Sequence, residues 1–137
     1  MIPRVGAVPI FTQDQDRALD FFCSKLGFKV LADYRIGPFR WVSVGREPGE
    51  TELIVYHPIP DFNGDEFEEL SRRIGTWTGI VFLTDNIYET YELWRRRGVV
   101  FAGPPERQPW GSWETRFSDF DGNQFHLAER PRPDARA

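Results

Sequence analysis

The chain contains two histidines, the side chains best suited to proton transfer near neutral pH. His126 lies in the alternating segment 124–127, where every second side chain points to the same face of a strand. We predict that His126 faces a ligand site and serves there as a general base or a hydrogen-bonding group. The alternative is an inward-facing histidine without chemistry. His57 follows Tyr56 at the end of an expected strand, where a rim or surface position is the alternative to a ligand contact.

Aromatic side chains make up 15% of the sequence, with five Trp and twelve Phe, more than a core of this size needs. Strand alternation over 113–118 puts Trp113 on one face and Glu114 and Arg116 on the other, while Trp110 lies in a loop of Pro and Gly. Such rings can stack on a flat or cationic ligand; packing in the core or at a subunit interface is the alternative. The predicted ligand-binding residues are Phe39, Trp41, Tyr56, His57, Trp110, Trp113, Arg116 and His126.

Other reactive side chains point to no further chemistry. Cys23 is the single cysteine, so the chain forms no internal disulfide and a reducing compartment is expected. Asp119 and Asp121 fall in an expected hairpin turn, where aspartate is favoured for its local backbone hydrogen bonds. The sequence contains no phosphate-binding loop and no dinucleotide fingerprint. We therefore expect no cofactor.

Two similar runs of secondary structure must position these residues. The first has a strand over Val5–Phe11, a helix that begins at Asp14 and ends at Gly27, and three strands. After a connector with a short helix at 66–72, the order restarts with a strand at 79–83 and a helix from Asp85 to Gly98. Strands at 99–101, 113–118 and 124–128 follow, the last two joined by a hairpin turn at 121–123. The three strands of the first run are expected at Phe28–Tyr34, Phe39–Val44 and Glu52–Tyr56.

This repetition predicts an α+β fold in which two βαβββ modules form a curved mixed sheet with a cleft. We expect one domain over 1–137, with module one at 4–57, a connector at 58–76, module two at 77–129 and a frayed tail at 130–137. The net charge of −4 does not favour nucleic acid as a partner. No stretch has the length of a membrane span or a signal peptide, so we expect a cytoplasmic protein without a membrane partner.

The chain resembles the vicinal oxygen chelate superfamily, which includes glyoxalase I, bleomycin-resistance proteins and extradiol dioxygenases. The resemblance covers residues 4–129 and is carried by IFTQDQDRALDFFCSKLGFKV, DNIYETYELWRRRGVVFAGPPERQPWG and FSDFDGNQFHLAE. It implies paired βαβββ modules, a homodimer and a cleft formed by the sheet. It also implies four metal-ligand positions, which fall here at Ala7, near Val55, at Thr78 or Gly79, and at His126. One imidazole does not hold a divalent ion by itself, so no metal site is predicted.

Three functions remain open from the sequence. The first is metal-free binding of a small aromatic or cationic molecule in an aromatic-lined cleft, as in bleomycin-resistance proteins. The second is a metal-independent lyase, isomerase or oxygenase that uses His126 as base, with Arg116 or a tyrosine steering an oxyanion. The third is an accessory subunit whose cleft is vestigial. A second polar side chain within reach of His126 in an open pocket would favour the second.

Overall fold

The computed structural model describes residues 1–131 of the chain, which divides into two compact units. The first unit comprises Met1–Thr76 with Phe120–Gly122, and the second comprises Trp77–Asp119 with Asn123–Ala137. Residues 132–137 of the tail that was predicted to fray lie outside the described part. Each unit contains its own hydrogen-bonded sheet.

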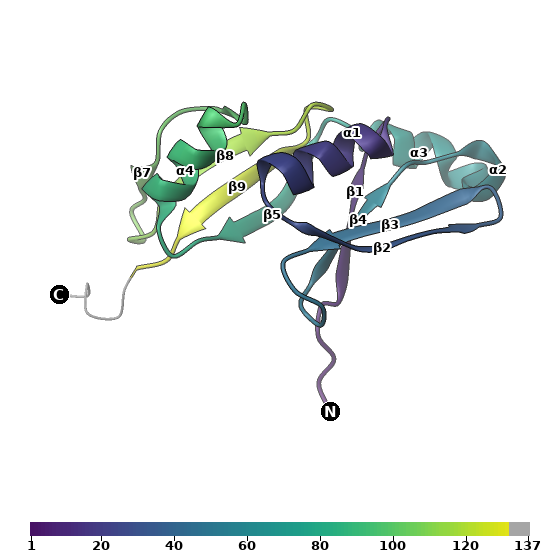
Figure 1. Cartoon of the computed structure of the whole chain (residues 1–137), viewed down its shortest axis with the longest axis horizontal. Coiled ribbons are helices and arrows are strands. Elements are labelled where there is room, and N and C mark those ends of the chain that lie inside the picture. Colours follow the sequence, from purple (N-terminus) through teal and green to yellow (C-terminus); the bar gives the residue numbers. More distant parts are fainter. Residues whose placement is uncertain (132–137) are drawn as a thin grey trace. The chain divides into compact units, whose positions relative to one another are not determined.

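The first unit is built on a four-stranded mixed sheet in the order β1-β4-β3-β2 (Figure 1). Strand β1 pairs with β4 in parallel, whereas β4 with β3 and β3 with β2 are antiparallel. Its elements in chain order are β1 (Ala7–Phe11), α1 (Gln15–Leu19), η1 (Asp20–Lys25), β2 (Lys29–Ile36), β3 (Phe39–Gly45) and β4 (Glu52–Tyr56). This is one βαβββ module, as the sequence predicts.

The first helix begins and ends where the sequence predicts, but its second half is wider than an α-helix. The Asp14 side chain caps the helix by accepting a hydrogen bond from the backbone N–H of Arg17 (3.0 Å). From Asp20 to Lys25 the chain forms the π-helical segment η1, with Leu26 N–H donating to the Phe21 carbonyl. Gly27 then leaves the helix at φ +92°. A residue pattern does not distinguish the two helix types.

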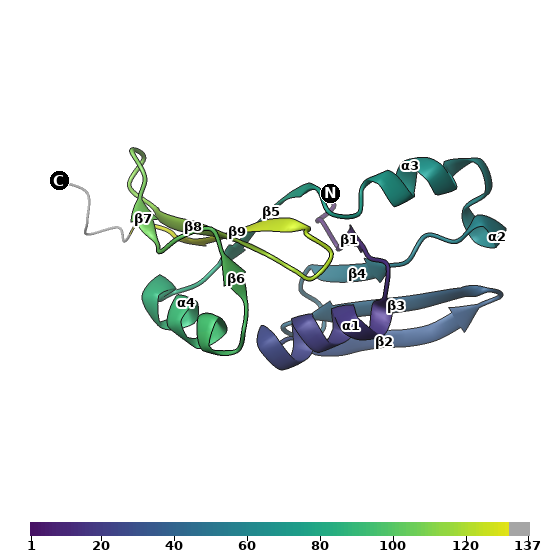
Figure 2. The same ribbon diagram turned by 90° about the horizontal axis from the view of Figure 1, so that it is seen from above.

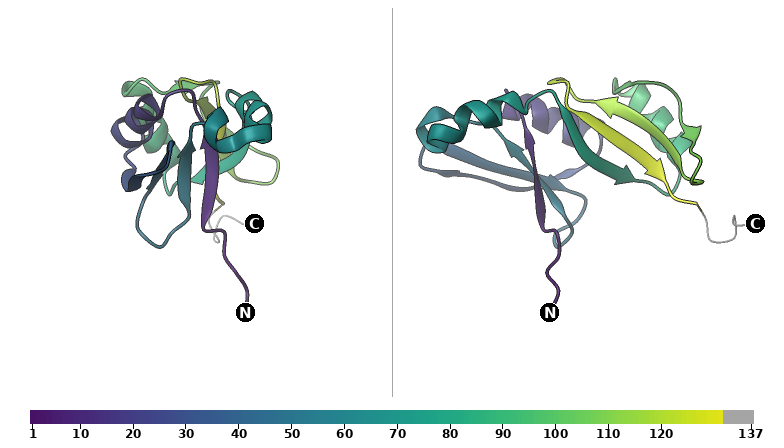
Figure 3. Two further views of the ribbon diagram at one scale, coloured as in Figure 1. Left: turned by 90° about the vertical axis from the view of Figure 1, so that its right-hand side faces the viewer. Right: turned by 180° about the vertical axis from the view of Figure 1, so that it is seen from behind.

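Three short helices follow β4 in the first unit: α2 (Pro60–Asn63), η2 (Gly64–Glu66) and α3 (Phe67–Arg72). Figure 3 shows this helical stretch as the teal coils. The predicted helix at 66–72 corresponds to α3. Phe62 of α2 stacks on Phe39 of β3, with ring centroids 4.4 Å apart. The connector therefore contributes an aromatic ring to the face of the sheet that carries Phe39.

The second unit repeats the module around a five-stranded sheet in the order β5-β9-β8-β6, with β7 paired to β8. Strands β5 and β9 are parallel and the other pairs are antiparallel. Figure 2 shows α4 along one side of these strands. The elements are β5 (Trp77–Leu83), α4 (Ile87–Arg96), β6 (Val100–Phe101), β7 (Glu106–Arg107), β8 (Trp113–Ser118) and β9 (Gln124–Glu129).

The core of the second unit lies between its sheet and α4. Phe117 of β8 is surrounded by the rings of Phe82, Trp94, Phe101 and Phe125, with centroids 5.2 to 5.7 Å away. Trp94 comes from α4, and Phe117 and Phe125 are buried. Since side chains alternate along a strand, burial of Phe117 on the helix side turns its neighbour Arg116 to the opposite face. The packing of this core thus decides which residues the open face presents.

Two details of the second unit differ from the sequence prediction. The helix is capped by Asn86 rather than by Asp85, because the Asn86 side chain accepts a hydrogen bond from the Glu89 N–H (3.1 Å). Strand β7 was not predicted, because a two-residue strand exists only through its pairing with β8.

The predicted hairpin turn between β8 and β9 is present, with Gly122 at φ +87°. Asp119 accepts hydrogen bonds from both the backbone and the side chain of Asn123 (2.9 Å each), so its role in the turn is confirmed. The α+β class with two βαβββ modules on mixed sheets is likewise confirmed. Among residues 1–131, no helix combines the length and apolar character that crossing a bilayer requires.

Candidate functional site

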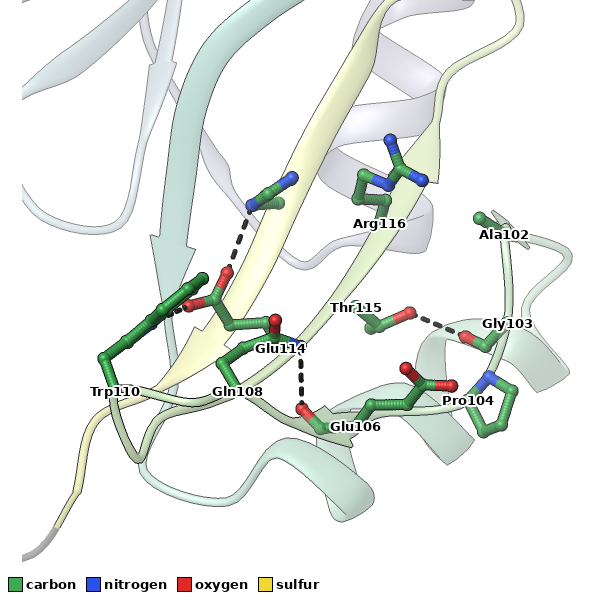
Figure 4. A pocket seen from close by; sticks show the side chains of 10 residues that line it. Ala102, Gly103, Pro104, Glu106, Gln108, Trp110, Glu114, Thr115 and Arg116 are labelled. Atoms are coloured by element: carbon green, nitrogen blue, oxygen red, sulfur yellow. Dashed lines mark hydrogen bonds and ion pairs between the residues drawn. The ribbon is translucent and has the colours of Figure 1, made fainter.

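A pocket of about 430 Å³ opens on the face of the second sheet opposite α4 (Figure 4). Polar and charged side chains form much of its wall. The lining residues are Ala102, Gly103, Pro104, Glu106, Gln108, Trp110, Glu114, Thr115, Arg116 and His126. They come from β7, β8, β9 and the loops that flank β7.

Strand pairing places the central residues of this pocket. Arg116 of β8 lies directly opposite His126 of β9, and Glu114 of β8 lies opposite Glu106 of β7. Directly opposed residues of an antiparallel pair share a face, with Cβ atoms about 5 Å apart. Glu114 and Arg116 are two residues apart and share that face as well. Three strands therefore bring four ionisable side chains to one side of the sheet.

The carboxylate of Glu114 is the most highly connected group in the pocket. Its Oε2 accepts hydrogen bonds from the Trp110 indole N–H (2.9 Å) and the Ser112 hydroxyl (2.6 Å). Its Oε1 lies 3.3 Å from Nδ1 of His126. The side chain of Glu114 is only 17% exposed. Glu114 thus joins the loop that carries Trp110 to the strand that carries His126.

The surroundings of Glu114 keep it ionised. Burial by itself would raise the pKa of this carboxyl group, but the hydrogen bonds from Ser112 and Trp110 and the nearby His126 outweigh that effect. The pKa of Glu114 consequently lies below its ordinary value. At neutral pH the pocket wall contains a negative charge that accepts hydrogen bonds on both oxygens.

Trp110 lies at the tip of a tight loop between β7 and β8. The loop is closed by hydrogen bonds from Gln108 N–H to the Ser112 carbonyl (2.8 Å) and from Gly111 N–H to the Gln108 carbonyl (2.9 Å). Gly111 has φ +97°, a conformation that other residues rarely adopt. Trp110 is 67% exposed although its indole N–H is hydrogen-bonded. A large ring is thereby held at the edge of the pocket with much of its surface open.

The sequence predicted four ligand-binding residues in this unit, and three of them line the pocket: Trp110, Arg116 and His126. Trp113 does not. It lies on the α4 side of β8, where its ring packs edge-on against Tyr88 of α4 with centroids 6.0 Å apart. The grouping of Trp113 with His126 is thus corrected, because alternation from the buried Phe117 turns Trp113 to the helix side.

The other four predicted residues belong to the first unit. Phe39 is a core residue, 2% exposed and in contact with Tyr56 (centroids 4.8 Å), which corrects its assignment as a ligand contact. Tyr56 is half-buried, and its hydroxyl accepts a hydrogen bond from the Asn63 amide. Trp41 stacks loosely on Tyr34, with centroids 6.4 Å apart. His57 Nδ1 lies 3.0 Å from the carbonyl of Thr12. The ligand contacts of Trp41, Tyr56 and His57 stay predictions.

The sequence prediction missed Glu114, Ser112, Gln108 and Glu106 as site residues. Alternation did place Glu114 on the face of Arg116, which was the available signal. Its importance depends on Oε2 meeting Trp110 and Ser112, and this follows from a loop conformation that the residue pattern does not specify. Glu106 reaches the pocket only through the pairing of β7 with β8.

The metal site that the superfamily resemblance implies does not fit the residues present. Ala7, Val55 and Gly79 have no donor side chain, and Val55 is fully buried in the core of the first unit. The hydroxyl of Thr78, the alternative to Gly79, donates a hydrogen bond to the Gln124 carbonyl (2.7 Å). His126 has one carboxylate neighbour, Glu114. Within the described part of the chain, no three His, Cys, Asp or Glu side chains group closely enough to hold an ion.

Residues 3–127 match the family model of the glyoxalase/bleomycin resistance protein/dioxygenase superfamily, and the chain belongs to this superfamily. The uncharacterized protein YetH of Bacillus subtilis (strain 168) is 36% identical over 130 residues, which cover 94% of this chain and all of YetH.

Solved structures agree with this assignment. A member of the same superfamily from Sphaerobacter thermophilus DSM 20745 is 38% identical and superposes with a TM-score of 0.82, covering 94% of this chain and 98% of that one. TnmS3, an antibiotic binding protein from Streptomyces sp. CB03234, is 28% identical with a TM-score of 0.78. That comparison covers 96% of this chain and 98% of TnmS3.

Proposed function

We propose that the protein binds a small, partly aromatic molecule, neutral or cationic, in the pocket of its second unit and needs no metal ion to do so. The observation that carries this proposal is the open Trp110 ring held beside a group of polar side chains. An aromatic face favours flat or cationic groups by about 1 kcal/mol per good contact. The similarity to an antibiotic binding protein also supports binding as the function.

The charges around the pocket support a neutral or cationic ligand rather than an anionic one. The lining residues include two carboxylates, Glu106 and Glu114, but only one guanidinium, Arg116. The pocket is more polar than the aromatic-lined cleft that the sequence predicted, since Trp110 is the one Phe, Tyr or Trp among its lining residues. We therefore expect a ligand with polar substituents on an aromatic ring system.

Calorimetric titration with three naphthalene probes tests the proposal. We expect 2-naphthylmethylammonium and 2-naphthol to bind, and 2-naphthoate to bind more weakly. Trp110→Ala should weaken binding by about fivefold to tenfold, because a stacking contact of about 1 kcal/mol or more is lost. Trp110→Phe is the matched control, since it keeps an aromatic face. If none of the probes binds, or if Trp110→Ala has no effect, the proposal is wrong.

A second function is favoured by one specific observation. His126 lies within reach of the Glu114 carboxylate in an open pocket, an arrangement that orients a general base. The second candidate is therefore metal-independent proton abstraction by His126. Deuterium exchange at the α-carbons of phenylacetone, followed by NMR, tests it. Protein-dependent exchange that disappears in His126→Gln would support catalysis, and no exchange above buffer would exclude it for this substrate class.

The accessory-subunit function has less support, because the pocket is open rather than filled by Trp and Phe side chains. Homodimer formation and a cytoplasmic location stay predictions. Light scattering on the purified protein, together with fractionation of producing cells, checks both.

A further inference from the structure

Both oxygens of the Glu114 carboxylate are engaged by groups that form the pocket. The Trp110 indole and the Ser112 hydroxyl approach Oε2, and Nδ1 of His126 approaches Oε1. Ser112 is buried, so its hydroxyl has little access to water as a substitute partner. One side chain thus contacts three others that come from two different elements of the second unit.

The chemistry of a carboxylate fixes the direction of these hydrogen bonds. An ionised carboxylate only accepts, so each of the three groups that face it must donate. An indole has only its N–H to offer, and a hydroxyl can rotate to donate. A neutral imidazole donates through one nitrogen and accepts through the other. Facing Glu114, His126 must therefore carry its proton on Nδ1, which leaves Nε2 as an acceptor.

We propose that Glu114 is the positioning residue of this pocket: it holds the Trp110 ring at the pocket edge and fixes the Nδ1–H tautomer of His126, with Nε2 free to accept from a ligand. The ligand part of this proposal rests on the proposed function, whereas the positioning of Trp110 and His126 does not. A ligand with an O–H or N–H group then donates a hydrogen bond to Nε2 of His126, in addition to stacking on Trp110.

The variant Glu114→Gln provides a sharp test because a carboxamide has almost the same shape but one acceptor and one donor end. If its oxygen replaces Oε2, its NH₂ group faces Nδ1 of His126 and moves the imidazole proton to Nε2. If its oxygen replaces Oε1, its NH₂ group opposes the indole N–H of Trp110. Neither orientation of the amide preserves both contacts.

NMR of the ¹⁵N-labelled full chain measures both contacts without any ligand. The imidazole nitrogens report the tautomer at about pH 9, where an ordinary histidine is neutral. His57→Gln separates the two histidines, and Trp110→Phe identifies one of the five indole signals. In the wild type we expect the Nδ1–H tautomer at His126. In Glu114→Gln we expect either the Nε2–H tautomer or a displaced Trp110 indole signal. The Trp77 ring packs on His126 with centroids 4.7 Å apart, so its indole signal shifts with the tautomer, whereas the indole signals of Trp41 and Trp94 stay unchanged.

Glu106→Gln is the matched control. Glu106 lies opposite Glu114 in the same pocket, and its substitution removes the same charge. It should leave the His126 tautomer and the Trp110 signal unchanged. Glu114→Asp retains the charge but shortens the side chain, and it should disturb at least one of the two signals. The proposal is overturned if Glu114→Gln leaves both signals at their wild-type positions, or if Glu106→Gln disturbs them equally.

A ligand comparison tests the acceptor on His126. Glu114→Gln should weaken binding of 2-naphthol by roughly tenfold, since a lost or unsatisfied hydrogen bond has an effect of this size. It should weaken binding of 2-methoxynaphthalene, which has no O–H, by less. Where the NMR spectrum of Glu114→Gln shows the Nε2–H tautomer of His126, equal weakening of both probes would refute the role of Nε2. If neither probe binds the wild type, the proposed function fails while the NMR result still decides the positioning role.

Discussion

Phe117 is the residue on which the arrangement of β8 depends most directly. Phe117 is 2% exposed, and its ring has four aromatic neighbours, Phe82, Trp94, Phe101 and Phe125. The same strand presents Glu114 and Arg116 to the pocket on its other face. Removing the Phe117 ring therefore tests whether the aromatic core of the second unit holds the pocket-forming strand in place.

Phe117→Ala should lower the free energy of unfolding by about 3–5 kcal/mol, because it removes a buried ring and leaves a cavity among aromatic neighbours. Domains of ordinary stability unfold with about 5–15 kcal/mol, so the loss is a large fraction of the total. Phe117→Leu fills most of the space and should cost less than about 1.5 kcal/mol. Urea unfolding followed by tryptophan fluorescence measures both changes.

Arg116→Ala serves as the control for this experiment. Arg116 is adjacent to Phe117 in the same strand, but its side chain is exposed on the opposite face. Its substitution should therefore change the free energy of unfolding by less than about 0.5 kcal/mol. The reasoning is refuted if Phe117→Ala costs less than about 1 kcal/mol, or no more than Arg116→Ala. Either result would mean that the aromatic cluster is not the core that fixes the face of β8.

Three further predictions concern single contacts. Trp110→Ala should change the free energy of unfolding by less than about 0.5 kcal/mol, since most of Trp110 is already exposed, and thermal unfolding measures this change. The same variant should still weaken binding of the naphthalene probes. Asn123→Ala should lower the free energy of unfolding by about 1–3 kcal/mol, because the buried Asp119 loses the side-chain donor of Asn123. Thermal unfolding measures this loss, with Asn123→Asp as the comparison. Hydrogen bonds and the charge of Arg40 hold the pKa of Asp33 below its ordinary range. The stabilising effect of Asp33 is hence fully present above the pKa that Asp33 has in the unfolded chain, about 3.9. It is lost as pH falls through the lower pKa that Asp33 has in the folded protein. Asp33 is exposed enough that its contribution to the free energy of unfolding stays below about 1 kcal/mol. Wild type and Asp33→Asn should therefore differ in the free energy of unfolding at neutral pH, and this difference should disappear in acid.

The sequence by itself determined the features that depend on neighbouring residues. The cap at Asp14, the helix end at Gly27 and the turn around Gly122 were all predicted, because capping and positive φ are local properties. The order of strands and helices and the two-module α+β fold followed from these signals. The alternation along β8 also separated Arg116 from Phe117 before any strand pairing was known.

Only the tertiary structure decided which residues meet. Arg116 faces His126 because β8 and β9 pair in one register, and Glu106 enters the pocket because β7 pairs with β8. In the sequence, Phe39 and Trp113 were as well suited to contact a ligand as Trp110. In the structure, Phe39 is buried under Phe62, and Trp113 packs on Tyr88. Local sequence fixes the spacing of side chains along an element, whereas register, loop conformation and the covering of each face are set by contacts between distant residues.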